Sequence, residues 1–299
     1  AFASAITTAG APRLEASPWP PACAASDVLS GAQAQAVVMS LSAIESSFLC
    51  VSAPGVGAYD PDHASLAVAI EYLTALEGDF WVKIRGAGLA YGASMSNSTD
   101  SRLLSFTLYR CTDLPAACTA AQQIIVDYAT GDASISQVDL DGARSSLAYG
   151  IIAGTATKLD AAKGGWLSSY LGKQVDYDKW LLERVAEVTP DDVLHALKRY
   201  IVPIFDPLAN ISVSCPVNKL QSIATYFSSQ GCNVMTVPEE KLIGTFGGRL
   251  GAEAAAKAGG TLPAPAPVPG SSKYLPGAFA QQFRCGCARC APKDEPQHQ

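Results

Sequence analysis

Histidine is the residue type whose spacing would most directly reveal a metal-dependent hydrolase, and this chain contains only three, His63, His195 and His298. A helical zinc-peptidase motif needs two His on one helix face and a Glu that serves as general base. Residues 63–67 read HASLA and supply neither the Glu nor the second His. We therefore expect no catalytic residue and no catalytic metal in this chain, and we interpret His63 and His195 as surface or half-buried structural residues.

Other chemical signals are absent or ambiguous. The chain has no Gly-x-Ser-x-Gly nucleophile elbow and no phosphate-binding Gly-rich loop that ends in Lys. Residues 86–92, GAGLAYG, superficially resemble a dinucleotide fingerprint, but they precede a strand-forming run instead of opening a helix after one. Cys285, Cys287 and Cys290, with His298, could bind a metal through three thiolates and an imidazole, or could belong to an unstructured tail.

Composition excludes some partners and favours one kind of compartment. The formal net charge is -6 without a long basic run, so a surface for duplex nucleic acid is not expected. No apolar run reaches the roughly 18 residues that a membrane span needs. Nine Cys, most of them scattered among apolar neighbours, are typical of buried free thiols and favour a reducing intracellular compartment, the cytoplasm or a mitochondrion.

Composition also divides the chain of 299 residues into three parts. Residues 1–35 are rich in Ala, Ser, Gly and Pro, which predicts a linker or an arm. Residues 36–243 carry regular patterns and predict one α/β domain. Ala, Gly and Pro dominate again over residues 244–299, which predicts a disordered tail that includes the Cys cluster.

Strand signals come in pairs in the first half of the predicted domain. Residues 36–41 and 46–52 are β-prone runs that predict a hairpin or paired strands. A helix follows from a cap at Asp60 or Asp62 to about Leu76. A short helical turn over residues 79–85 is predicted next, with Phe80 and Trp81 as core or interface anchors. Two strands over 89–96 and 103–110 then flank a turn at 97–100.

Helices dominate the middle of the domain and one of their starts is well marked. Thr189 can cap a helix, Pro190 suits its first position, and Asp191 and Asp192 favour the positive end of the helix dipole. We expect helices over 115–129, 136–158, 161–171, 177–188, 190–200 and 216–229, with strands over 210–215 and 233–237. This order favours an α+β fold with a single mixed or antiparallel sheet that helices cover on one face.

The segment over residues 76–92, LEGDFWVKIRGAGLAYG, carries a specific resemblance. It resembles the C-terminal halves of pitrilysin-like (M16, inverted-zinc-motif) metallopeptidases, in which an Arg precedes a Gly-rich turn and a Tyr-Gly pair begins a strand. The likeness is greatest to the long peptidases related to presequence protease and more distant to insulin-degrading enzyme. It continues to the last strand and covers about two thirds of the chain.

The resemblance implies a role for two residues. In that family two bowl-shaped halves enclose a peptide, and the C-terminal half contributes an Arg and a Tyr, which correspond by position to Arg85 and Tyr91. An Arg can donate to peptide carbonyl oxygens, and a Tyr hydroxyl can donate to the oxyanion of a tetrahedral intermediate. Gly86 and Gly88 would tighten the turn. The structural alternative is an ion-paired Arg at a helix end and a Tyr that fills the sheet face.

Three functions stay open from the sequence. The leading hypothesis is a substrate-clamping C-terminal part of an M16 zinc metalloendopeptidase, inactive alone, with zinc and the Glu base in an N-terminal catalytic half encoded in the same or another chain. The main alternative is a non-catalytic M16-fold structural or scaffold subunit of a larger complex, such as one in an organelle. The third is a peptide-binding module without catalysis.

Overall fold

A single mixed sheet forms the centre of the protein. The computed structural model describes residues 35–207 and 209–241, which form a six-stranded sheet in the order β3-β4-β2-β5-β1-β6. β1 pairs in parallel with β5 and β6, and the remaining neighbours are antiparallel. The strands are β1 (Gln35–Leu41), β2 (Ser47–Pro54), β3 (Ala90–Ser98), β4 (Leu103–Cys111), β5 (Asn210–Pro216) and β6 (Asn233–Val237).

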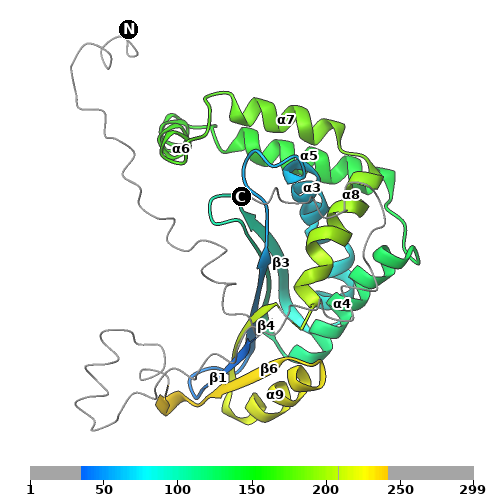
Figure 1. Cartoon of the computed structure of the whole chain (residues 1–299), viewed down its shortest axis with the longest axis vertical. Coiled ribbons are helices and arrows are strands. Elements are labelled where there is room, and N and C mark those ends of the chain that lie inside the picture. Colours follow the sequence, from blue (N-terminus) through cyan, green and yellow to red (C-terminus); the bar gives the residue numbers. More distant parts are fainter. Residues whose placement is uncertain (1–34, 208, 242–299) are drawn as a thin grey trace, which may run out of the picture.

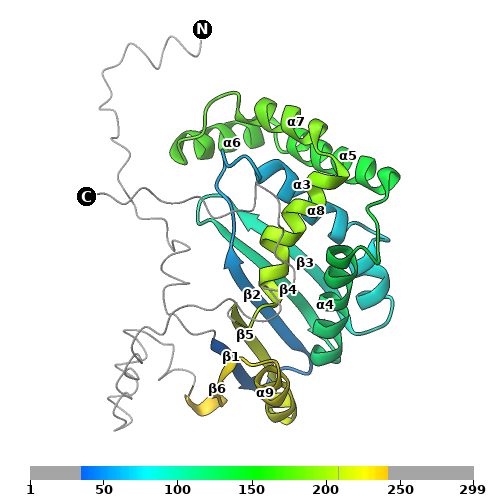
Figure 2. The same ribbon diagram turned by 45° about the vertical axis from the view of Figure 1, so that its right-hand side comes forward.

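Helices cover one face of this sheet. Figures 1 and 2 show α3, α4, α8 and α9 against the same face, with α5 and α7 outside α3, whereas the opposite face carries no helix in the described part of the chain. The α+β class and its one-sided helical layer are therefore confirmed. The helices are α3 (His63–Thr74), η1 (Trp81–Arg85), α4 (Leu114–Thr130), α5 (Gln137–Ala153), α6 (Lys158–Tyr170), α7 (Tyr177–Glu187), α8 (Pro190–Ala196), η2 (Leu197–Ile201), η3 (Val202–Phe205), η4 (Val217–Lys219) and α9 (Leu220–Ser229).

The predicted linker and tail lie outside the residues that the structure describes, except for one residue of the linker. The linker expected over residues 1–35 lies there except for Gln35, as does the tail expected over residues 244–299. The Cys285, Cys287 and Cys290 cluster and His298 belong to that tail. The described residues contain no helix long and apolar enough to cross a membrane.

The hairpin predicted from the first two β-prone runs is wrong. β5 lies between β1 and β2, so that Val213 is paired with Val38 on one side and with Leu49 on the other. All three side chains are buried. The insertion gives each of the two runs a central, two-sided position in the core, which a pattern confined to neighbouring residues does not reveal.

Strand alternation separates a buried face from an open face. In β4, Leu104, Phe106 and Leu108 are buried beneath the helices, whereas Tyr109 is 46% exposed on the other side. In β2, Leu49 is buried and the preceding Phe48 points to the open face with Tyr109, at 5.4 Å between ring centroids. The face without helices is therefore where side chains of the sheet meet solvent or a partner.

Two predicted helix starts have different outcomes. The cap of α8 is confirmed, because Thr189 Oγ1 accepts from the Asp192 amide and the Asp192 carboxylate accepts from the Thr189 amide. At the start of α3, Asp62 makes no side-chain cap and instead accepts a hydrogen bond of 2.7 Å from the Tyr200 hydroxyl. The predicted cap by Asp62 is wrong because a residue from a distant helix takes its carboxylate. Asp60, the other predicted cap, accepts from the Asp62 amide at 2.9 Å, one residue before the helix.

Candidate functional site

The turn η1 positions the predicted arginine. Phe80 and Ile84 are 1% and 0% exposed, so they fix the turn to the core, which confirms Phe80 as an anchor. Trp81 and Arg85 lie on the outer side of the same turn and are half-buried. η1 is a π-helical turn, a geometry that is frequent at functional sites. The packing of Phe80 and Ile84 therefore determines where the Arg85 side chain begins.

Arg85 contacts two aromatic rings. Its guanidinium carbon lies 4.0 Å from the centroid of Trp81 and 4.5 Å from that of Tyr91. Each such cation–π contact contributes about 0.5–1 kcal/mol when exposed and more when desolvated. No carboxylate pairs with Arg85 within the described residues, so the alternative of an ion-paired Arg at the helix end does not describe this part of the chain.

The glycines after Arg85 satisfy two backbone requirements. Gly88 has a φ of +71°, in the region that favours glycine. A Cβ on Gly86 would lie 2.5 Å from the Val82 carbonyl oxygen. The chain then turns directly into β3, with the Leu89 amide donating to the Ile84 carbonyl at 3.0 Å. This tight connection brings Tyr91 back over Arg85.

Tyr91 connects Arg85 to further aromatic residues on the open face. Its side chain is 58% exposed, and its hydroxyl makes no hydrogen bond within the described part of the chain. Its ring meets that of Tyr109 at 6.3 Å, and Tyr109 in turn meets Phe48. We call Phe48, Trp81, Arg85, Tyr91, Tyr109 and Arg110 the arginine–aromatic cluster.

A bulge in β4 adds Arg110 to this cluster. Between Ser47 and Leu49 of β2, the register shifts from Cys111 to Leu108 of β4, so one extra residue of β4 is accommodated there. Arg110 adopts a φ of +52°, and its guanidinium carbon lies 5.5 Å from the Tyr109 centroid. The bulge therefore leaves both Tyr109 and Arg110 on the exposed side.

Arg85 and Tyr91 were predicted from the sequence as substrate-binding residues, whereas Phe48, Tyr109 and Arg110 were not. The structure brings all of them together from three strands and one turn. An aromatic residue at a solvent-facing position of an otherwise alternating strand was the available signal for Phe48 and Tyr109. Arg110 had no such signal, because its position depends on the bulge.

Both described histidines are buried more deeply than predicted. His63 Nδ1 lies 3.2 Å from the Ala58 carbonyl oxygen and 3.2 Å from the Tyr177 hydroxyl, and burial lowers its pKa. His195 is 9% exposed on α8. No group of three or more His, Cys, Asp or Glu side chains within the described ranges is placed to hold a metal ion.

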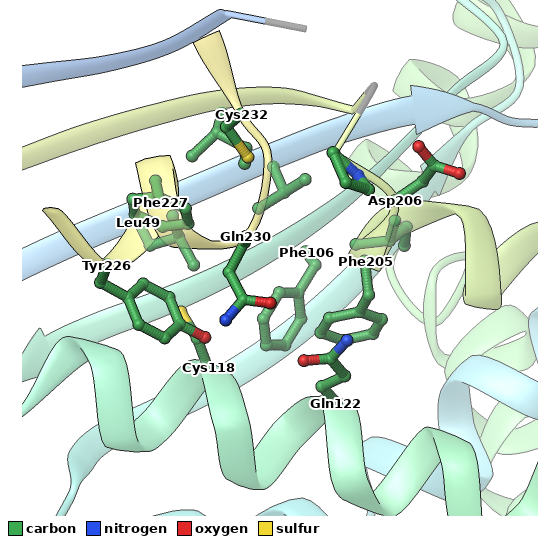
Figure 3. Close-up of a pocket in the computed structure, with 14 residues that line it drawn as sticks. Leu49, Phe106, Cys118, Gln122, Phe205, Asp206, Tyr226, Phe227, Gln230 and Cys232 are labelled. Atoms are coloured by element: carbon green, nitrogen blue, oxygen red, sulfur yellow. The ribbon is translucent and has the colours of Figure 1, made fainter. Parts of the chain in front are cut away.

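A small cavity on the helical side is a second candidate site. Figure 3 shows Gln122 of α4 and Gln230, just after α9, pointing into it above Phe106. Its volume is about 50 Å³, far below the roughly 300–1,000 Å³ of ordinary ligand pockets. Burial raises the pKa of the lining Cys232 to about 11 and also raises that of Cys118, so neither is an activated thiol. The cavity fits a packing defect better than a substrate site.

Comparison with known proteins gives relatives of unknown activity. No protein-family model matches the chain. It is 34% identical over 186 residues to the uncharacterized protein YOL098C of Saccharomyces cerevisiae, which covers 59% of this chain and 17% of that protein. It is 29% identical over 208 residues to the uncharacterized protein C3H1.02c of Schizosaccharomyces pombe, which covers 68% of this chain and 20% of that protein. The chain thus spans about a fifth of the length of these curated relatives.

Solved structures define the class of fold. The peptidase M16 inactive domain from Pseudomonas fluorescens is similar with a TM-score of 0.52 and 17% identity, covering 62% of this chain and 44% of that one. A protease from Helicobacter pylori gives a TM-score of 0.51 and 14% identity, covering 61% and 44%. An inactive peptidase domain from Bordetella parapertussis gives 0.50 and 18%, covering 58% and 93%. The described residues therefore have the fold of an M16 peptidase domain.

Proposed function

We propose that this chain is a non-catalytic, substrate-clamping part of an M16 zinc metalloendopeptidase related to presequence protease and insulin-degrading enzyme. In this proposal Arg85 and Tyr91 bind an extended peptide. Zinc and the Glu base belong to an N-terminal catalytic half, in the same polypeptide or in a partner chain. Two of the solved neighbours are themselves named inactive domains, which supports a non-catalytic role.

The stacking of Arg85 is the observation that carries the proposal. Two aromatic rings contact the guanidinium, and in the described residues no carboxylate pairs with it. An arginine fixed in this way can donate to peptide carbonyl oxygens without losing much side-chain freedom on binding. The exposed Tyr91 hydroxyl is available as a donor to the oxyanion of the tetrahedral intermediate.

The open face of the sheet provides the surface along which a peptide would lie. Phe48 and Tyr109 extend the cluster from the edge strand β3 across β4 to β2. Aromatic rings of this kind bind apolar side chains of an extended chain with little loss of entropy. The bound peptide would then lie between this face and the catalytic half.

A structural or scaffold subunit is the second candidate function, and α6 is the observation that favours it. No residue of α6 is buried, and its Trp166 and Tyr170 are 68% and 52% exposed. Exposed aromatic residues on one helix are typical of a surface that another protein covers. This surface is compatible with either function, because a clamp also needs to join its catalytic half.

Peptide binding to the chain tests the clamp. Fluorescence anisotropy of a labelled, unstructured ten-residue peptide should show saturable binding to the wild type. Arg85→Gln should weaken that binding by about tenfold, since it removes a charge-assisted donor. Tyr91→Phe should weaken it by a smaller factor.

Arg184→Gln and Tyr149→Phe are matched controls, because Arg184 is 58% exposed on α7 and Tyr149 is 75% exposed on α5, both outside the cluster. Neither should change peptide affinity. Absence of binding, or equal losses in the controls and in the cluster variants, would overturn the clamp.

A further inference from the structure

The N–H edge of the Arg85 guanidinium is suited to binding a planar anion. Trp81 and Tyr91 contact this guanidinium, and its N–H donors all lie in its plane. A peptide carbonyl oxygen can use one such donor well, whereas a carboxylate takes two parallel N–H···O bonds in the same plane. The planar N–H edge of Arg85 therefore offers a geometry that a carboxylate matches more fully than a backbone carbonyl does.

The cluster carries positive charge that no carboxylate of the described residues neutralises, which also favours an anionic ligand. Arg85 and Arg110 have no ion-pair partner in the described part of a chain that has 27 acidic residues. The acidic residues nearest to them in sequence are engaged elsewhere. Asp79 lies 3.1 Å from Lys83 Nζ and accepts from the Tyr128 hydroxyl, and Asp113 accepts from the Ala116 amide at the start of α4.

Exposed rings adjoin the two guanidinium groups. Tyr91 and Tyr109 are 58% and 46% exposed, and both contact an arginine. Apolar surface beside a cation lowers the local dielectric and strengthens a hydrogen-bonded ion pair that forms there. An apolar side chain next to a carboxylate in the ligand would add contact area with these rings.

We propose that the arginine–aromatic cluster selects peptide segments in which an acidic side chain stands beside a large apolar one. This inference rests on the proposed clamp and gives its substrate class. Arg85 receives the carboxylate in its plane, Arg110 adds positive charge, and Phe48, Tyr91 and Tyr109 receive the apolar neighbour. The cluster would thus prefer an acidic peptide, whereas the net charge of -6 of the whole chain would suggest a cationic one.

Three peptides that differ at one position test the preference for an acidic side chain separately from peptide binding itself. The probes are fluorescein-labelled ten-residue peptides of Ala, Gly and Ser whose centre reads Leu-Glu-Phe, Leu-Gln-Phe or Leu-Lys-Phe. Anisotropy should give an affinity about tenfold higher for the Glu peptide than for the Gln peptide, with the Lys peptide weakest. The Glu preference should shrink as salt rises, because screening weakens an exposed pair.

Variants assign the preference to the cluster. Arg85→Gln should bring the Glu-to-Gln affinity ratio close to one, and Arg110→Gln should reduce it partly, whereas Arg184→Gln should leave it unchanged. Equal melting temperatures establish that each variant is folded. Equal wild-type affinities for the Glu and Gln peptides would overturn the inference while leaving the clamp in place. Failure to bind any of the three would overturn both.

Discussion

Arg85 depends on two neighbours that do different work. Phe80 is buried in the core, whereas Trp81 is half-buried and stacks on the guanidinium. Both residues were expected to be core or interface anchors, but their roles differ. Phe80 stabilises the fold, whereas Trp81 orients Arg85. Substitutions at these adjacent positions should have distinct consequences.

Replacing the two aromatic residues distinguishes anchoring from orientation. Phe80→Ala should lower the free energy of unfolding by about 3–5 kcal/mol, because it removes a buried ring and leaves a cavity. Trp81→Ala should cost less stability but weaken peptide binding severalfold, because Arg85 loses one stacking partner. Urea unfolding and anisotropy on the same samples measure both effects. Equal losses of stability in the two variants would contradict the assignment.

His63 should make stability depend on pH. Burial lowers its folded pKa below the ordinary value near 6.5, so the unfolded chain binds a proton that the folded one resists. Stability that is present above about pH 6.5 should be lost as the pH falls from there towards the folded pKa.

The variant His63→Gln should flatten that dependence. Its unfolding free energy should fall less steeply than that of the wild type between about pH 7 and pH 5, where one proton contributes up to about 1.4 kcal/mol per pH unit. Denaturant titrations at several pH values measure the slopes. Identical slopes in the two proteins would show that His63 carries no pH dependence.

At the scale of elements, α6 differs from the other long helices. It has no buried residue, and Gly164 and Gly165 occupy its interior. Each glycine costs about 1 kcal/mol relative to alanine, and a helix of this length is marginal without packing. α4, by contrast, buries eight residues, including Ile124 and Ile125, and is capped by Asp113. The stability of α6 should therefore be local and low unless a partner covers it.

Hydrogen exchange tests this contrast. Amides of α6 should exchange at least about a hundredfold faster than those in the middle of α4. Gly164→Ala and Gly165→Ala should slow exchange in α6, because a Cβ at either position meets nothing within 4 Å. Gly142→Ala in α5 is the matched control and should leave α6 unchanged. Equal protection of α4 and α6 in the isolated chain would contradict this account.

Patterns among neighbouring residues predicted individual helices and strands better than they predicted which strands pair in the sheet. The strands around residues 89–96 and 103–110 and the start at Thr189 were visible because each depends on neighbouring residues. The helix expected over 136–158 ends at Ala153, since Gly154 closes it and Thr157 caps the next helix. The place of β5 between β1 and β2 depends on pairing across more than a hundred and fifty residues, which one sequence does not display.

The candidate site was predictable to the same extent. Arg85, Gly86, Gly88 and Tyr91 lie within one short segment and carry the family resemblance. Tyr109 meets Tyr91 only through the pairing of β3 with β4. Cluster residues that lie close together in the sequence could therefore be predicted. Cluster residues that are brought together only by strand pairing could not.

At the scale of the whole molecule, the proposed function assigns peptide binding and catalysis to different halves. Because the proposed function assigns zinc and the Glu base to the catalytic half, the purified chain should hydrolyse no fluorogenic peptide. With a catalytic half present, Tyr91→Phe should lower turnover by about 10²–10³, the usual cost of one lost oxyanion donor. Chelator-sensitive hydrolysis by the chain alone, or wild-type turnover in the variant, would contradict this division.

The most direct test is a map of where peptide binds. Titration of the isotope-labelled chain with the Leu-Glu-Phe peptide, followed by NMR, reports shifts at each amide and at the Arg and Trp side-chain N–H groups. We expect the largest shifts at Trp81, Arg85, Tyr91 and Tyr109. Shifts confined to α6 or to the helix-covered side, with these four residues unmoved, would contradict it.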